Sequence, residues 1–264
     1  MMNSRGIAVV TGAGRGVGKV LTERLSAAGY TVVALGRSAN TLGAVAADTG
    51  AIPVVVDVSD PIAVADSWDR IESEVGVPTL LVNNAGVAGG TGLTWEQPPV
   101  DWWRVFETNV LGTFLLSRAV LPAMVSAGRG RIVNVASGAA FYPVLDDEDP
   151  NVNSAYMASK AAVIRFSEAL AGETAPTGVR VFAISPGMVK TDMTAGVFAE
   201  YWDDPDVWSA PEVTADLVEF IGTGALDSLS GRYIHAASDD WTALAERSAD
   251  VMARDLHTMR VHTL

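Results

Sequence analysis

Residues 11–18 read Thr11-Gly12-Ala13-Gly14-Arg15-Gly16-Val17-Gly18, directly after the apolar run at 7–10 and before a helix-forming stretch. A strand, a glycine turn and a helix in this order can bind a phosphate, because glycines admit the anion closely and the helix N-terminus points free amides at it. The glycines at 12, 16 and 18 do not follow G-x-G-x-x-G, and no Gly-Lys-Ser/Thr follows for a Walker loop. The stretch therefore predicts a nucleotide phosphate loop with its own spacing.

Further apolar, β-branched runs recur along the chain. They lie at 31–35, 52–56, 80–82, 132–135, 179–184 and 232–234. Segments of helical length stand between them, including 18–28, 61–75, 102–127 and 155–174. Continuous apolar runs indicate strands that are covered on both faces. The pattern predicts an α/β fold: a single doubly wound domain over residues 1–264, with about seven parallel strands and helices on both faces.

Composition narrows the function classes. The 264 residues carry 18 basic and 31 acidic side chains, a net charge of −13, which argues against nucleic acid as a partner. The absence of cysteine excludes disulfides, thiolate zinc sites and cysteine nucleophiles. His235, His257 and His262 lack metal-ligand spacing, so we expect no metal. No uninterrupted apolar stretch of eighteen residues occurs, so we expect a cytoplasmic protein without a membrane partner.

Polar motifs follow the later predicted strands in a fixed order. They are Asn83-Asn84-Ala85-Gly86, Asn109 in the next long helix, Ser137 after the fifth strand, Tyr156-Met157-Ala158-Ser159-Lys160, and Ser185-Pro186-Gly187 through Thr191. With the T-G-x-x-x-G-x-G loop, their order and spacing over about residues 5–235 resemble the short-chain dehydrogenase/reductase family. The resemblance implies a Rossmann-like fold, a nicotinamide cofactor and hydride transfer between that cofactor and a carbonyl or secondary alcohol.

Tyr156 and Lys160 are four residues apart on a predicted helix, so their side chains share one face. A nearby ammonium stabilises phenolate, so we expect Lys160 to lower the pKa of Tyr156 and tune it as a general acid/base. Ser137 would supply a second hydrogen bond to the substrate oxygen. Ser154 is a weaker alternative for that role, and alone each of these residues would more often be a surface or turn residue.

The resemblance adds two roles within the expected catalytic set of Asn109, Ser137, Tyr156 and Lys160. Lys160 would also hold the nicotinamide ribose. Asn109 would stabilise a helix kink that seats a water relay from Lys160 to solvent.

The end of the second predicted strand bears on the choice of nicotinamide. Gly36 stands where an acidic residue would bind the ribose 2′-hydroxyl of NAD, and Arg37 follows it. Arg37 and Arg15 could clamp a 2′-phosphate, which resembles the NADP(H)-preferring branch of the family. The alternative is that both arginines serve solubility. Asp57 matches the family's adenine-binding aspartate; it could instead cap the next helix, although Ser59 or Asp60 is better placed for that.

The resemblance thus gives a full set of cofactor-binding candidates. They are Gly12, Arg15, Gly16, Val17, Gly18, Arg37, Ser38, Asp57, Val58, Asn83, Ala85, Gly86, Tyr156, Lys160, Pro186, Gly187, Val189 and Thr191. Thr191 would bind the nicotinamide carboxamide, and Val189 would do so through its backbone.

The substrate side is less specific. Ser137 and Tyr156 are 19 residues apart, more than is usual in the family, so the resemblance implies that residues 141–150 are an insertion. Its acidic part at 145–150 is either a solvated loop or a substrate contact. Large apolar residues gather at about 188–210, where the resemblance implies a substrate lid. The pocket candidates are Trp95, Phe141, Tyr142, Met188, Met193, Phe198 and Trp202. They favour an apolar, cyclic or aromatic ketone or a 3-oxoacyl-type substrate.

Residues 241–264 show apolar positions three to four apart and predict a C-terminal helix for packing or oligomer contact. The family's usual valine-aspartate-glycine-glycine ending is missing. The long helices at 102–127 and 155–174 resemble those that pair family subunits, so we expect a homodimer or homotetramer. Two alternatives remain: a regulatory protein that binds NADP(H) without turnover, and an NAD-specific alcohol dehydrogenase.

Overall fold

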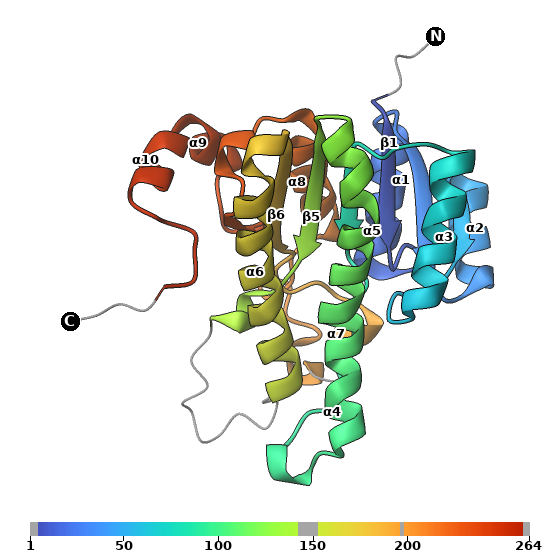
Figure 1. Cartoon of the computed structure of the whole chain (residues 1–264). Helices are drawn as coiled ribbons and strands as arrows, with labels where there is room; N and C mark the ends of the chain where they lie inside the picture. The colour runs from blue at the N-terminus through green and yellow to red at the C-terminus, as the bar shows by residue number, and fades with distance from the viewer. Residues whose placement is uncertain (1–4, 142–152, 196–197, 261–264) are drawn as a thin grey trace.

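Seven parallel strands form one sheet in the order β3-β2-β1-β4-β5-β6-β7 (Figure 1). The computed structural model describes residues 5–141, 153–195 and 198–260. The chain builds the sheet outward from β1 to β3, then returns to the other side of β1 and continues from β4 to β7. This order confirms the α/β, doubly wound, seven-stranded fold expected from the apolar runs.

The strands begin and end within about two residues of the positions expected from the apolar runs. They are β1 (Ile7–Thr11), β2 (Thr31–Gly36), β3 (Ile52–Val55), β4 (Leu80–Asn83), β5 (Gly130–Val135), β6 (Val179–Ser185) and β7 (Tyr233–His235). The α-helices are α1 (Gly16–Ala27), α2 (Ala39–Thr49), α3 (Pro61–Glu74), α4 (Pro99–Phe106), α5 (Gly112–Ser126), α6 (Ser154–Thr174), α7 (Asp192–Ala195), α8 (Pro211–Thr223), α9 (Trp241–Glu246) and α10 (Ser248–Ala253). Helices α2 and α8 were not among the helical segments that we named from the sequence.

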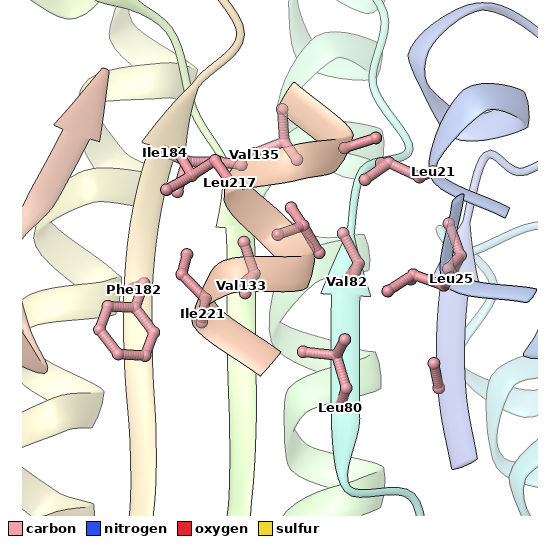
Figure 2. Close-up of a cluster of buried hydrophobic side chains, with 14 of the residues drawn as sticks. Leu21, Leu25, Leu80, Val82, Val133, Val135, Phe182, Ile184, Leu217 and Ile221 are labelled. Carbon is pink, nitrogen blue, oxygen red and sulfur yellow. The ribbon is translucent and has the colours of Figure 1, made fainter. Parts of the chain in front are cut away.

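Helices cover both faces of the sheet. On one face α1 and α8 pack together, and their side chains Leu21, Leu25, Leu217 and Ile221 meet the strands in one apolar cluster (Figure 2). On the other face α3, α5 and α6 bury a second cluster against the same strands. Burial on two sides explains why central strands such as β1 and β4 are continuously apolar rather than alternating, whereas the border strand β3 is mostly exposed.

The helical run Pro99–Ser126 passes continuously from α4 through a π-helical turn, η2 (Glu107–Leu111), into α5. Among the described residues it is the one helix long and apolar enough to cross a membrane by length and composition. Its α5 part carries the fully buried side chains Leu116, Val120 and Met124 in the core beneath the sheet. We therefore interpret it as a core helix of this fold.

The expected single helix at 241–264 is wrong over its described part. Helices α9 and α10 are short, and Asp255 and His257 then take positive φ values of 52° and 59°, which end helical geometry. The Tyr233 N–H donates to the His257 carbonyl at 2.9 Å, so this segment lies along β7. The apolar spacing arises because Leu256 packs on the α1 and α8 face, while Met259 packs against a third cluster beside α6.

Candidate active site

Four of the expected motifs follow the carboxyl ends of strands: the glycine loop follows β1, Asn83-Asn84-Ala85-Gly86 stands at the end of β4, Ser137 follows β5, and Ser185-Pro186-Gly187 stands at the end of β6. In Figure 1 the arrow of β5 points towards the end of the molecule where α4 and α7 lie. The strand order reverses between β1 and β4, and doubly wound sheets usually bind their ligands in the crevice at the carboxyl edge of such a switch point.

The phosphate loop has the backbone that its glycines allow. Gly12 and Gly16 have φ values of +65° and +52°, and a Cβ on Gly18 would collide with the carbonyl oxygen of Gly12. In this described stretch the N-cap residue of α1, Arg15, makes no side-chain hydrogen bond to the helix, and the first turn holds no acidic residue. The loop and the positive end of α1 thus form a cradle for an anion.

Thr11 and Asn84 support the cradle and were not among the candidate residues. The Thr11 hydroxyl oxygen accepts from the backbone N–H groups of Asn84 and Ala85, both at 2.9 Å. The Asn84 side chain donates to the Thr11 carbonyl at 2.9 Å. These bonds tie the ends of β1 and β4 together. Both residues stand inside the quoted motifs, which was the signal that could have identified them.

Asn83 differs from its neighbours because its side chain points into the sheet. It is 4% exposed, and its Nδ2 donates to Asn134 Oδ1 at 2.8 Å and to Ser117 Oγ at 3.1 Å. Asn134 in turn donates to Ser167 on α6 at 2.9 Å. The Asn83 side chain therefore joins β4, β5, α5 and α6 rather than lining the crevice.

Ser137, Tyr156 and Lys160 come together at the end of β5. The Ser137 hydroxyl is hydrogen-bonded to the Tyr156 phenol. Lys160 is 4% exposed, its Nζ donates to the Val135 carbonyl at 2.7 Å, and that nitrogen lies 5.6 Å from the Tyr156 ring centroid. The arrangement gives one phenol, one hydroxyl and one ammonium within a small space.

The pKa expectation for Tyr156 is wrong in this structure. Burial raises the pKa of the phenol, and the hydrogen bond with Ser137 only partly opposes that effect. Burial also lowers the pKa of Lys160 to about 8. Removal from water disfavours the charged form of each group, the phenolate of Tyr156 and the ammonium of Lys160.

Ser154, the alternative to Ser137, faces another element. Its Oγ accepts from Trp102 Nε1 at 3.1 Å and from the Thr94 hydroxyl at 3.1 Å. Ser154 therefore holds the start of α6 against α4, while Ser137 contacts the phenol.

Asn109 lies in the π-helical turn η2 and is 1% exposed. Its Oδ1 accepts from the Val87 N–H at 2.9 Å, and its Nδ2 donates to the Val87 carbonyl at 3.0 Å and to Ser159 Oγ at 2.9 Å. A Cβ on Gly86 would lie 3.3 Å from Asn109 Oδ1 and 3.5 Å from Lys160 Nζ. A local widening of the helix thus brings Asn109 beside Lys160.

The two arginines at the nucleotide end each meet a carboxylate. Arg37 Nη1 lies 3.9 Å from Asp57 Oδ2, and Arg15 Nη1 lies 2.7 Å from Asp192 Oδ2. Although burial raises the Asp57 pKa, hydrogen bonds from Ser59 and the charge of Arg37 hold it below its usual range. A cavity of about 630 Å³ runs from Arg37 and Asp57 to α4 and the start of α6.

Asp60 caps α3 by accepting from the N–H groups of Ile62 and Ala63 at 2.9 and 3.1 Å, as its position suggested. Asp57 therefore does not cap α3. Ser38 caps α2 through the Thr41 N–H at 3.3 Å, and Val58 is buried, 6% exposed.

The lid segment, residues 188–210, contacts the phosphate loop. A Cβ on Gly16 would lie 3.3 Å from Thr191 Cγ2. The Thr194 hydroxyl accepts from the Thr191 N–H at 2.9 Å and donates to the Val189 carbonyl at 2.8 Å, which fixes the turn into α7. Further back, Ser185 Oγ accepts from the Gly187 N–H at 3.3 Å, and Pro186 stands between them.

The substrate candidates do not form one wall. Met188, Met193, Phe198 and Trp202 share the lid segment, and the Trp202 ring packs edge-to-face on Trp208 at 5.3 Å. Phe141 instead packs on Tyr233 of β7 at 4.9 Å. Trp95 stands before α4 and is 80% exposed, with no ring contact to a lid aromatic in the described ranges. Tyr142 and the acidic run at 145–150 lie outside the described residues.

Within the described residues, no group of three or more histidine, cysteine, aspartate or glutamate side chains is arranged to hold a metal ion.

Known proteins resemble this chain over most of its length. The family model described as short chain dehydrogenase matches residues 6–202. A short chain dehydrogenase from Pseudocercospora fijiensis is 37% identical over 194 residues, covering 71% of this chain and 61% of that protein's length. The 3-oxoacyl-[acyl-carrier-protein] reductase FabG from Escherichia coli is 33% identical over 245 residues, covering 89% and 97%. The crystal structure of a short-chain type dehydrogenase/reductase from Mycobacterium marinum superposes with a TM-score of 0.80 at 30% identity, covering 88% and 94%.

Proposed function

The chain belongs to the short-chain dehydrogenase family of oxidoreductases, and on that premise we propose that it transfers hydride between NADP(H) and a carbonyl or secondary alcohol. The observation that carries the proposal is the group of Ser137, Tyr156 and Lys160 beside the glycine cradle. A protein that only senses a nucleotide would have no use for a buried proton donor at this place.

The residues of the crevice fit a nicotinamide dinucleotide. Gly12 and Gly16 have positive φ values, and a Cβ on Gly18 would collide with the Gly12 carbonyl oxygen, so the turn requires glycine at these positions. A glycine turn of this kind before a helix lets the backbone approach a pyrophosphate closely. Lys160 would hold the nicotinamide ribose, and Val189 and Thr191 the carboxamide. When bound, the nicotinamide would supply a hydride to the carbonyl carbon or accept one from the alcohol.

The chain's own residues then manage the proton. In the reducing direction the Tyr156 phenol donates its proton to the substrate oxygen, and its raised pKa keeps it protonated near neutrality. The Ser137 hydroxyl donates a second hydrogen bond to that oxygen as negative charge develops there. Lys160, whose pKa is about 8, can release and regain a proton near neutral pH and so recharge the phenol. Asn109 holds the helix turn that faces Lys160.

The preference for NADP(H) rests on charge. Gly36 offers no carboxylate to a ribose 2′-hydroxyl, and Arg15 and Arg37 project exposed guanidinium groups at the same edge of the sheet. Guanidinium groups bind phosphate through paired hydrogen bonds. Substitution of Arg37 by Asp should weaken turnover with NADPH much more than with NADH; equal losses would favour the NAD-specific alternative.

We propose an apolar, cyclic or aromatic ketone or a 3-oxoacyl-type compound as substrate. Met188, Met193, Phe198 and Trp202 on the lid segment supply apolar surface. The 3-oxoacyl name of the similar reductase from Escherichia coli supports the second class. We also propose that the protein is cytoplasmic and forms a homodimer or homotetramer. We propose no nucleic acid or membrane partner.

The test is oxidation of NADPH and NADH, followed by nicotinamide absorbance, against aliphatic, cyclic, aromatic and β-keto ester ketones. Turnover with NADPH that disappears in Tyr156→Phe supports the proposal. Tight NADPH binding without turnover on any ketone would instead favour the sensor.

A further inference from the structure

An ion pair joins the phosphate loop to the lid segment. Arg15 Nη1 donates to Asp192 Oδ2 at 2.7 Å, although the two residues are 177 positions apart. Arg15 is the N-cap residue of α1, and Asp192 is the first residue of α7. The guanidinium that we assign to a cofactor phosphate therefore already has an anionic partner within the chain.

The backbone around Asp192 is fixed in this position. Thr194 Oγ1 accepts from the Thr191 N–H at 2.9 Å, and the Thr191 methyl approaches Gly16 of the loop. Lys190, the nearest cation along the lid segment, is directed elsewhere: its Nζ lies 5.3 Å from the Trp202 ring and 5.6 Å from the Trp208 ring. In the described part of the chain, Arg15 is the one cation that pairs with Asp192.

Both side chains are largely in water, with 68% of Arg15 and 79% of Asp192 exposed. An ion pair this exposed is weak and readily exchanged, because water solvates each partner nearly as well. A phosphate monoester carries more charge than one carboxylate and can accept paired hydrogen bonds from a guanidinium. It can therefore displace Asp192 from Arg15, at the cost of breaking this pair.

We propose that Asp192 is a specificity-determining residue that competes with the cofactor's 2′-phosphate for Arg15. With NAD(H), which lacks that phosphate, Arg15 stays paired with Asp192. With NADP(H), the phosphate takes Arg15 and leaves the carboxylate unpaired beside a dianion. Asp192 thus restrains the preference for NADP(H) that Arg15 and Arg37 create. This inference rests on the proposed function.

The experiment measures dissociation constants of NADPH and NADH by titration calorimetry for the full-length protein and for Asp192→Asn. Asparagine keeps the shape of the side chain and removes its charge. The strength of an exposed ion pair converts to a gain of about two- to five-fold in NADPH affinity, with NADH affinity nearly unchanged. The gain should shrink as salt screens the charges.

Two controls separate competition at Arg15 from a general change in charge. Asp203→Asn removes an exposed carboxylate from the same lid segment and should leave the ratio of the two constants unchanged. In an Arg15→Ala background, Asp192→Asn should no longer raise NADPH affinity, because the guanidinium for which Asp192 and the phosphate compete is absent.

The outcomes are distinct. An unchanged or lower NADPH preference in Asp192→Asn, or a gain that persists without Arg15, overturns this inference while leaving the proposed function intact. Failure of the parent protein to bind either nucleotide would overturn both.

Discussion

Burial of Lys160 gives the first prediction, because a cation at this position is costly to the stability of the fold. The group is 4% exposed, and burial lowers its pKa from the 10.5 of a free side chain to about 8. Near neutral pH the folded protein must hold a proton on a poorly solvated amine, whereas the unfolded chain holds it in water. Lys160→Met keeps the volume and removes the charge, so it should abolish activity while relieving this cost.

The magnitude follows from proton linkage. A shift from 10.5 to about 8 corresponds to a penalty of about 3 kcal/mol at about pH 7, falling to about 1 kcal/mol at about pH 10. The sign is definite: the unfolded chain binds more protons between these pKa values, so the parent protein gains stability there as pH rises. Loss of the hydrogen bond to the Val135 carbonyl offsets part of the benefit in the variant, by about 1–3 kcal/mol, but does so at every pH.

The assay is urea unfolding of the parent and of Lys160→Met at several pH values between about 7 and 10, with the difference in unfolding free energy plotted against pH. That difference should move by about 2 kcal/mol in favour of the parent protein. Lys19→Met, at an exposed lysine of α1, is the matched control and should give a much flatter line. A flat line for Lys160→Met, or one of opposite slope, would refute the reasoning.

Three other substitutions test the site and the fold. Gly18→Ala places a methyl group against the Gly12 carbonyl, so NADPH binding measured by calorimetry should weaken more than about tenfold while circular dichroism stays unchanged; unaltered affinity would contradict the cradle. Tyr156→Phe should lower kcat by about 10²–10⁴-fold at similar NADPH affinity. A loss smaller than this would mean that another group donates the proton. Leu217→Ala opens a cavity beneath α8, where the parent side chain is fully buried, and should cost about 2–5 kcal/mol in urea unfolding at unchanged NADPH affinity; a loss below about 1 kcal/mol would mean that the cluster in Figure 2 repacks.

The sequence predicted features that depend on local pattern. Strands buried on both faces leave continuous apolar runs, so β1, β4, β5 and β6 could be placed within a residue or two. Glycine spacing marked the phosphate loop, since Gly12, Gly16 and Gly18 are required by backbone conformation and close approach.

Features that depend on the direction of a side chain could not be predicted. Asn83 and Asn84 are adjacent, yet the Asn83 side chain bonds to Asn134 of the neighbouring strand β5, whereas the Asn84 side chain bonds to Thr11 of β1. Side chains alternate in direction along a strand, and the sequence did not show where β4 ends. The pKa of Tyr156 follows from burial, which spacing to Lys160 does not reveal. After α10 the apolar residues still recur at helical spacing, but the segment is not a helix. Leu256 and Met259 instead pack against two different apolar clusters.

The segment after α10, which contains His257, covers one border of the sheet. Strand β7 is an outer strand, and both polar backbone groups of Tyr233 are engaged by His257: its N–H meets the His257 carbonyl, and its carbonyl meets the imidazole at 2.9 Å. At the opposite border, β3 carries Pro53, which has no N–H to offer an incoming strand. Exposed strand edges invite pairing with another molecule and growth into aggregates. The folded-back chain at one border and the proline at the other thus leave fewer free backbone groups with which the strand of another molecule could pair.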